Sequence, residues 1–303
     1  MTGSPAAHMP EAHGMGQVIV ALLKLRIVAL LLVAAMAGAF LASDGRPGGR
    51  EMLVLVLAGA ASAGGASALN EYFERGRDAL MQRTRGRRPL ATGAIARPAA
   101  ALMAGVSLAT GAVLLTLLFN PILSLFLFLG AFVYVVIYTL WLKPRTSLNI
   151  VVGGLAVSCA VLSGSAAVHA WADPGALLLA LMLFLWTPIH FWSLAMVYRE
   201  DYARVGVPML PVQATPRTAA AWSLAHGVGA GATACLLALW LSFDPIYLAP
   251  ALAMTALLIG RSVQLVITPS SNRAWRVFHT SNIFLLVVLL AACLASVVQI
   301  PRF

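Results

Sequence analysis

Charged residues are scarce in this chain. Of its 303 residues only 10 are acidic and 20 are basic, while 61% are hydrophobic. No soluble domain of this length hides so much apolar surface, so the lipid bilayer must be the solvent for most of it. Cysteine is also rare: Cys159, Cys235 and Cys293 lie far apart in apolar segments, without the spacing of metal ligands. We expect them to be small buried hydrophobic residues.

The apolar residues fall into stretches near the roughly 20 residues that a membrane-spanning helix needs. Breaks rich in proline, glycine, aspartate and asparagine separate them. The sequence therefore predicts an all-α polytopic membrane protein, with about nine transmembrane helices around a central cavity. The expected spans are residues 18–43, 51–71, 97–118, 121–142, 147–170, 175–198, 218–241, 246–267 and 277–299.

The basic residues indicate the orientation of these spans. With a cytoplasmic N-terminus, only Arg46, Arg50 and Arg302 fall outside, which leaves 17 of the 20 basic residues inside and satisfies the positive-inside rule. The net charge of +10 then reflects topology and anion binding. Nucleic acid is not an expected partner, because no soluble basic domain exists to carry it. The lack of an arginine-rich transit segment favours a bacterial inner membrane.

Loop lengths suggest how the chain is organised. Residues 1–16 are polar and are predicted to form a flexible tail before one intramembrane domain, residues 17–303. Most connections are short, but residues 72–96 and 199–217 form two long charged loops, four helices apart, on the predicted cytoplasmic side. We therefore expect two halves, about 18–142 and 147–267, followed by a ninth helix at 277–299. Each half would contribute one polar loop to a shared site.

The first long loop carries the strongest pattern in the chain. Asn70, Glu74 and Asp78 follow one another at four-residue spacing, which places their oxygen-bearing side chains on one face of a helix. Oxygen ligands suit a hard cation such as Mg²⁺, and the arginines that follow suit phosphate. The alternative is a surface helix with a chance charge pattern, but acids near the hydrocarbon boundary are costly and usually functional. The arginines are Arg83, Arg85, Arg87 and Arg88.

The second long loop begins with Glu200 and Asp201 at the end of a predicted helix. Arg204 lies four residues after Glu200 and can pair with it. On its own this pattern also fits a solvated helix end that leads into a proline-containing turn. Because both loops are predicted on the same side of the membrane, we interpret it as a second cation-binding arm.

Several motifs together resemble one known family. Asn70 to Gly93, read as N-x-x-x-E-x-x-x-D-A-L-M-Q-R-T and then R-P-L-A-T-G, is similar to the signature of the protoheme IX farnesyltransferases (haem O synthases). These enzymes belong to the UbiA superfamily of intramembrane prenyltransferases. The resemblance spans most of residues 20–300. Further matches are Lys24-Leu25-Arg26, Tyr138-Thr139 through Lys143 to Asn149-Ile150-Val151, His190-Phe191-Trp192, and Asp201-Tyr202 through Pro211.

The resemblance implies that a farnesyl group passes from farnesyl diphosphate to a vinyl group of haem b, with Mg²⁺ on the departing diphosphate. The catalytic residues are then Asn70, Glu74, Asp78 and Asp201, and the metal ligands are these four with Glu200. The diphosphate is expected at Arg83, Arg87, Arg88 and Lys143, with Lys24 and Arg26 as further candidates. Haem is expected at His190, His279, Tyr138, Asn149 and Tyr202. A haem A synthase or oxidase assembly factors are the implied protein partners.

Two departures from the family pattern keep other functions open. Three residues, Arg85-Gly86-Arg87, separate Arg83-Thr84 from Arg88-Pro89 where the family has two, and small residues fill 156–168. One alternative is a UbiA-type prenyltransferase with a quinone precursor or another aromatic acceptor, although Glu74 stands where such enzymes carry aspartate. A non-enzymatic haem or lipid transporter is the other. Transporters place charged residues near the bilayer midplane, whereas here the acids cluster at one interface.

Overall fold

The computed structural model describes residues 14–242 and 244–298, and within them every regular element is helical. In this part of the chain nine helical spans are long and apolar enough to cross a membrane, which confirms the predicted fold class. They are α2 (Leu25–Ala42), α3 (Gly49–Leu80), α5 (Pro98–Leu117), α6 (Pro121–Phe132) continued by the π-helix η1 (Val133–Leu142), α7 (Asn149–Ala167), α8 (Pro174–Val197), α11 (Pro216–Trp240), α12 (Pro245–Ile267) and α13 (Ser271–Val298).

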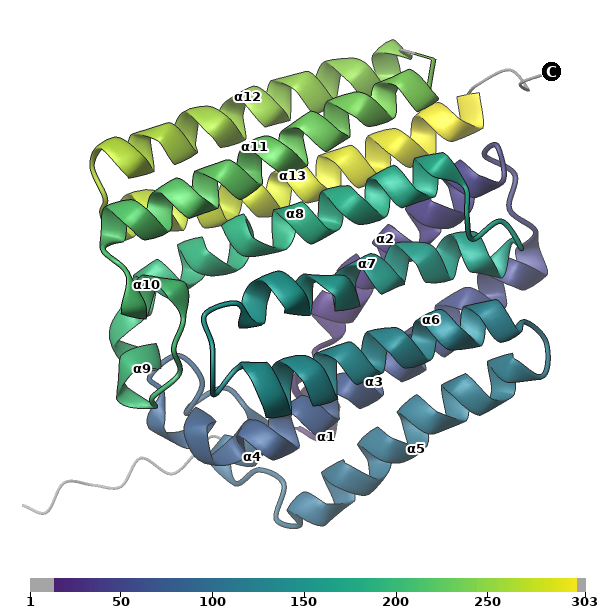
Figure 1. Ribbon diagram of the computed structural model, residues 1–303. Coiled ribbons are helices and arrows are strands. Elements are labelled where there is room, and N and C mark those ends of the chain that lie inside the picture. The colour runs from purple at the N-terminus through teal and green to yellow at the C-terminus, as the bar shows by residue number, and fades with distance from the viewer. Residues whose placement is uncertain (1–13, 243, 299–303) are drawn as a thin grey trace, which may run out of the picture.

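Four short helices gather at one end of the bundle, which we call the loop end (Figure 1). They are α1 (Met15–Leu22), α4 (Pro89–Thr92), α9 (Arg199–Arg204) and α10 (Leu210–Gln213). Helices α4, α9 and α10 lie within the two long loops that the sequence predicts, so those loops are partly ordered into helical turns.

The starts of the long helices follow from local sequence. Five of them begin with proline, whose missing N–H costs nothing in the first turn. In four of these the preceding side chain accepts a hydrogen bond from a backbone N–H of that turn. The caps are Asn120, Asp173, Thr215 and Asp244.

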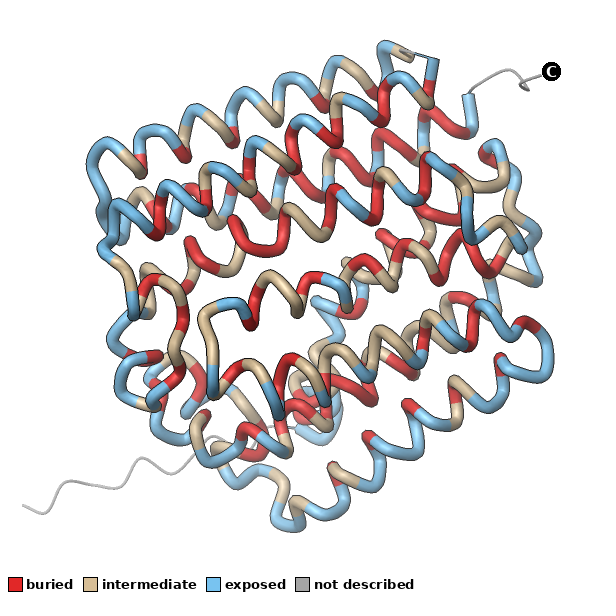
Figure 2. Tube along the Cα trace, in the orientation of Figure 1, coloured by how far each residue is buried: buried red, intermediate tan, exposed pale blue. Residues whose placement is uncertain are grey.

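Helices α2 and α7 cross in direct backbone contact near the middle of the bundle. A Cβ added to Gly38 would lie 2.2 Å from the carbonyl oxygen of Val161, and one added to Gly164 would lie 1.7 Å from that of Ala35. Only glycine allows this approach. The main core joins this crossing to α8, α11, α12 and α13, which pack together. Helix α5 packs on α3 and α6 and is exposed along its outer side (Figure 2).

The structure corrects the boundaries of three predicted elements. The first span, residues 18–43, is divided into α1 and α2, because Lys24 takes a left-handed conformation with φ of 50°. Residues 15 and 16 of the predicted tail belong to α1, and residues 1–13 lie outside the described part. Helix α3 continues nine residues beyond the predicted end at residue 71. The acidic motif is therefore part of one continuous helix, which is possible because its charges find partners inside the protein.

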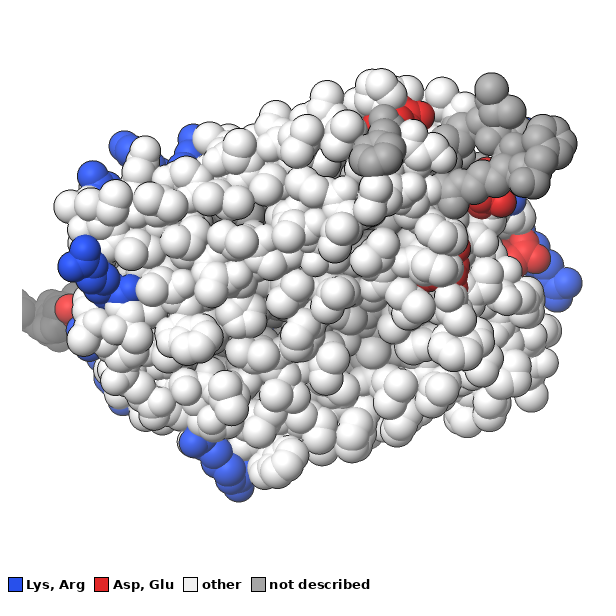
Figure 3. Space-filling view, turned by 45° about the horizontal axis from the view of Figure 1, so that its top comes forward, with Lys and Arg blue, Asp and Glu red and all other residues white. Residues whose placement is uncertain are grey.

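The flank of the molecule carries few charged side chains. Figure 3 shows a white flank, with most Lys and Arg side chains in view gathered at the loop end. This distribution is what a bilayer around the flank requires. The cytoplasmic orientation of the loop end, the two pseudo-halves and the central cavity remain predictions.

Candidate active site

Three polar side chains of α3 form the floor of the candidate site. Asn70, Glu74 and Asp78 are each only 2% exposed, and their four-residue spacing places them on one face of the helix, as predicted. Burial of two carboxylates so close together requires compensating cations. In the structure, two of the residues expected to bind phosphate, Arg88 and Lys143, lie beside the acids and supply these cations.

Arg88 and Lys143 neutralise the two carboxylates. One guanidinium nitrogen of Arg88 contacts Asp78 and also lies 3.3 Å from Glu74 Oε2, while the Lys143 ammonium pairs with Glu74 Oε1. Burial alone would lower the pKa of Arg88, but the Asp78 and Glu74 carboxylates raise it above its ordinary value. Among these four side chains, two negative charges therefore face two positive charges before any ligand enters.

Lys24 enters the same cluster from the junction of α1 and α2. Its ammonium donates to Asn70 Oδ1 at 2.5 Å and to the Tyr134 hydroxyl at 3.2 Å. Burial, together with the nearby positive charge of Arg88, lowers the pKa of Lys24 to about 7.

The donor set of α3 fits a hard divalent cation. It offers one amide oxygen and two carboxylates, all of them buried on the same face of the helix. In the described residues no three Asp, Glu, His or Cys side chains form a complete metal cage. Mg²⁺ does not need one, because it is usually held by one or two carboxylates, waters and the phosphates of its substrate.

Asp201 connects the second loop to the first in a way that the sequence does not predict. Its Oδ1 and Oδ2 accept hydrogen bonds from the backbone N–H groups of Gln82 and Arg83 at 3.1 and 2.9 Å, and Oδ1 also pairs with Arg204 at 3.0 Å. Both oxygens are thus engaged by the loop after α3. These contacts tie Asp201 to the loop after α3, and its predicted grip on a metal from the opposite side stays a prediction.

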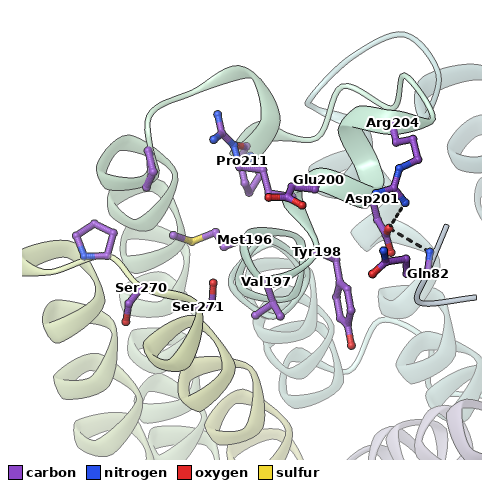
Figure 4. A pocket seen from close by; sticks show the side chains of 13 residues that line it. Gln82, Met196, Val197, Tyr198, Glu200, Asp201, Arg204, Pro211, Ser270 and Ser271 are labelled. Carbon is purple, nitrogen blue, oxygen red and sulfur yellow. Dashed lines mark hydrogen bonds and ion pairs between the residues drawn. The ribbon is translucent and has the colours of Figure 1, made fainter.

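Glu200, the other predicted ligand of the second loop, is exposed. It lines a cavity of about 470 Å³ between the ends of α8 and α9, the start of α11 and the α12–α13 turn. Figure 4 shows Asp201 turned towards Gln82 and Arg204, whereas Glu200 is turned away from them beside Pro211. Glu200 and Asp201 therefore point to different places, as neighbours on a helix do.

The remaining arginines predicted to bind phosphate are not all close to the acids. Arg83 lies between two aromatic rings, with its guanidinium carbon 5.8 Å from the ring centre of Tyr198 and 5.9 Å from that of Tyr202. It also donates to the Tyr202 hydroxyl at 3.5 Å. Arg26 and Arg87 are exposed at the surface. Only Arg88, Lys143 and Lys24 contact the α3 motif itself.

The residues predicted to contact the acceptor fall into two groups. His190 on α8 is stacked between Trp186 and Phe278, at ring-centre distances of 4.4 and 4.6 Å, and its Nδ1 lies 3.0 Å from Ser281 Oγ. His279 is exposed on α13. The second group, Tyr138, Tyr202 and Asn149, is buried nearer the acids. Asn149 Oδ1 is buried there without a hydrogen-bond partner.

Three residues of the site were not selected from the sequence. Glu71 is fully buried and accepts a hydrogen bond from the Leu90 N–H at 2.9 Å, which holds the start of α4 beside Arg88. Tyr134 and Thr139 contact Lys24 and Asn70. Glu71 directly follows Asn70 in the sequence but falls outside the four-residue spacing of the motif. No sequence feature predicts the π-helix that carries Tyr134 and Thr139.

Comparisons with known proteins place this geometry in a family. The sequence model described as the UbiA prenyltransferase family matches residues 31–297. The chain is 39% identical to the protoheme IX farnesyltransferase of Metallosphaera sedula, with 91% of this chain and 94% of that protein covered. It is 40% identical to protoheme IX farnesyltransferase 1 of Saccharopolyspora erythraea, with 100% and 99% covered.

Solved structures show the same fold. A digeranylgeranylglyceryl phosphate synthase structure is similar with a TM-score of 0.77 at 18% identity, over 93% of this chain and 99% of that one. A UbiA homologue from Archaeoglobus fulgidus, bound to DMAPP and Mg²⁺, is similar with a TM-score of 0.67 at 15% identity, over 93% and 99%.

Proposed function

Because the chain belongs to the UbiA prenyltransferase family, we propose that it transfers a farnesyl group from farnesyl diphosphate to a vinyl group of haem b, giving haem O. Relatives that carry the name protoheme IX farnesyltransferase support the donor and the acceptor. One structural observation carries the chemistry. It is the buried, charge-balanced cluster of Asn70, Glu74 and Asp78 with Arg88 and Lys143 at the loop end.

The cluster can exchange its ion pairs when a metal diphosphate enters. We propose that Asn70, Glu74 and Asp78 hold Mg²⁺, while Arg88, Lys143 and Lys24 turn to the phosphate oxygens. When bound, the metal would supply Lewis-acid neutralisation of charge on the leaving group. Each basic residue exchanges a carboxylate or amide oxygen for a phosphate oxygen, so no buried charge is left alone. Asp201 keeps the loop of Gln82 and Arg83 closed over this end.

The chemical steps balance with water as the one further reactant. The allylic C–O bond of farnesyl diphosphate breaks, and its electron pair leaves with the diphosphate. The haem vinyl group then attacks the allylic carbon, and water adds to the resulting cation and releases a proton, which completes a hydroxyethylfarnesyl group. Tyr134 and Tyr138, stacked at 5.9 Å between ring centres, can stabilise positive charge through their faces, and the apolar bundle keeps bulk water away.

The protein is a multi-pass membrane protein. We propose that it lies in the bacterial inner membrane with the loop end in the cytoplasm. Farnesyl diphosphate suits a site at this membrane surface, because its head is water-soluble and its tail is lipid-soluble. The positive charge of this end supports that orientation.

The test incubates membranes that contain the protein with farnesyl diphosphate, Mg²⁺ and haem b, and detects farnesylated haem by mass. We expect product from the wild type and none from Asp78→Asn, which removes one negative charge from the cluster. Asp44→Asn is the matched control, because Asp44 is exposed in the loop between α2 and α3, at the other end of α3. Normal turnover by Asp78→Asn would refute the metal role. Prenylation of 4-hydroxybenzoate in place of haem would refute the acceptor.

A further inference from the structure

The π-helix η1 determines which side chains face the acidic motif. Its hydrogen bonds join residues five apart, as in the contact between the Lys143 N–H and the Tyr138 carbonyl. Residues five apart therefore share a face, as Tyr134 does with Thr139 and Tyr138 with Lys143. Thr139 and Lys143 contact Asn70 and Glu74 of α3, and Tyr134 contacts Lys24 beside them. In an α-helix, at about 100° per residue, such pairs would be rotated about 140° apart.

Thr139 uses its one hydroxyl hydrogen inside this π-helix. Its Oγ1 donates to the carbonyl oxygen of Tyr134 at 2.8 Å, five residues earlier. A hydroxyl group has a single hydrogen but two acceptor positions. Towards α3, Thr139 can therefore only accept a hydrogen bond, and it accepts one from Asn70 Nδ2 at 3.0 Å.

This polarity decides which way the amide of Asn70 is turned. With its NH₂ group on Thr139, Asn70 presents Oδ1 on the other side, where the Lys24 ammonium donates to it. A reversed amide would set an acceptor against an acceptor at Thr139 and a donor against a donor at Lys24. Both Asn70 and Thr139 are 2% exposed, so no bulk water is available to relieve such a mismatch.

We propose that Thr139 is a positioning residue for the metal–diphosphate site, because it turns Oδ1 of Asn70, the only atom of that side chain able to bind a metal, towards the site. This role rests on the proposed function, since it assumes that Asn70 is a metal ligand. The Tyr134 carbonyl commits the Thr139 hydrogen, and the π-helix places this hydroxyl on the face that meets Asn70. Partners that orient a ligand in this way commonly change metal affinity by about 10–100-fold when they are removed.

The test measures binding of Mn²⁺, a spectroscopic substitute for Mg²⁺, by electron paramagnetic resonance in the presence of farnesyl thiodiphosphate, which resists cleavage. Thr139→Val has almost the same shape but no hydroxyl, and we expect it to weaken Mn²⁺ binding about tenfold. Thr139→Ser keeps the hydroxyl and should bind within about twofold of the wild type. Thr233→Val is the matched control, because the buried Thr233 hydroxyl on α11 bonds only to the Gly229 carbonyl of its own helix.

A double-variant comparison separates positioning from a general structural effect. In an Asn70→Ala background, Thr139→Val should cause no further loss of Mn²⁺ affinity, because the side chain it orients is gone. An unchanged affinity in Thr139→Val, an equal loss in Thr139→Ser, or an additional loss in the Asn70→Ala background would each overturn the proposal.

The same samples keep the two proposals distinguishable. A wild type that binds Mn²⁺ with the thiodiphosphate but does not farnesylate haem would contradict the proposed acceptor and leave the role of Thr139 standing. Normal farnesylation by the wild type with unchanged Mn²⁺ affinity in Thr139→Val would contradict the role of Thr139 alone. A wild type that binds no Mn²⁺ would overturn both.

Discussion

Replacing Arg88 with methionine should destabilise the protein strongly, because this arginine balances two buried carboxylates. Glu74 and Asp78 have side chains that are 3% exposed, and one nitrogen of Arg88 contacts both. The charges of Glu74, Asp78, Arg88 and Lys143 sum to zero, and Arg88→Met leaves this set with one excess negative charge. Removing one partner of a buried ion pair costs about 3–5 kcal/mol, and we expect a loss of unfolding free energy of that size.

The measurement is a denaturant titration of the purified protein in detergent micelles. Arg85→Met is the matched control, because Arg85 is exposed in the same loop, and it should change the unfolding free energy by less than about 0.5 kcal/mol. Adding Asp78→Asn to Arg88→Met returns the net charge to zero and should recover more than half of the loss. The reasoning is refuted if Arg88→Met behaves like Arg85→Met, or if the two substitutions destabilise the protein additively.

Stabilisation by a free divalent cation gives a second measurement of the same charge balance. In Arg88→Met the two carboxylates lack their shared arginine, so Mg²⁺ without diphosphate should stabilise this variant and not the wild type. At a tenfold excess over the dissociation constant, the gain would be about 1.4 kcal/mol. Stabilisation of the wild type by the same amount would contradict the idea that Arg88 occupies the place of the cation.

Two further predictions concern the bundle and its loop end. Gly164→Ala should destabilise the protein by about 1–3 kcal/mol in the same titration, because the added Cβ meets a backbone carbonyl of α2. Gly111→Ala on α5 should not destabilise it, because nothing lies within 4 Å of the added Cβ. Equal effects of the two substitutions would disprove the backbone contact. Asp201→Ala should raise hydrogen exchange at the two loop amides that it binds by about tenfold, since a hydrogen bond to a charged group contributes about 1.5–3 kcal/mol. Glu200→Ala should leave the exchange unchanged, and faster exchange in both variants would argue against a specific contact.

Local composition is enough to predict most of the fold. Long apolar stretches can satisfy their backbone groups in lipid only as helices. A proline marks where five of them begin, and in four of these it follows a capping side chain. The spacing of Asn70, Glu74 and Asp78 likewise requires a shared face once the segment is helical. These features depend on neighbours within a few residues, so they can be read without a structure. The division at Lys24 cannot be predicted from local sequence, because lysine is not a residue that usually takes a positive φ.

The partners of the charged and polar side chains in the site depend on contacts between distant parts of the chain. The sequence alone determined an all-helical membrane protein with an oxygen-rich face at the end of one span, because burial of apolar residues and helical periodicity act locally. Only the tertiary structure decided that Arg88 and Lys143 neutralise that face, that a π-helix turns Thr139 towards Asn70, and that Asp201 holds backbone amides of the other loop. Such partners are chosen by the charge and hydrogen-bond balance of a buried volume, which exists only once the helices have packed together.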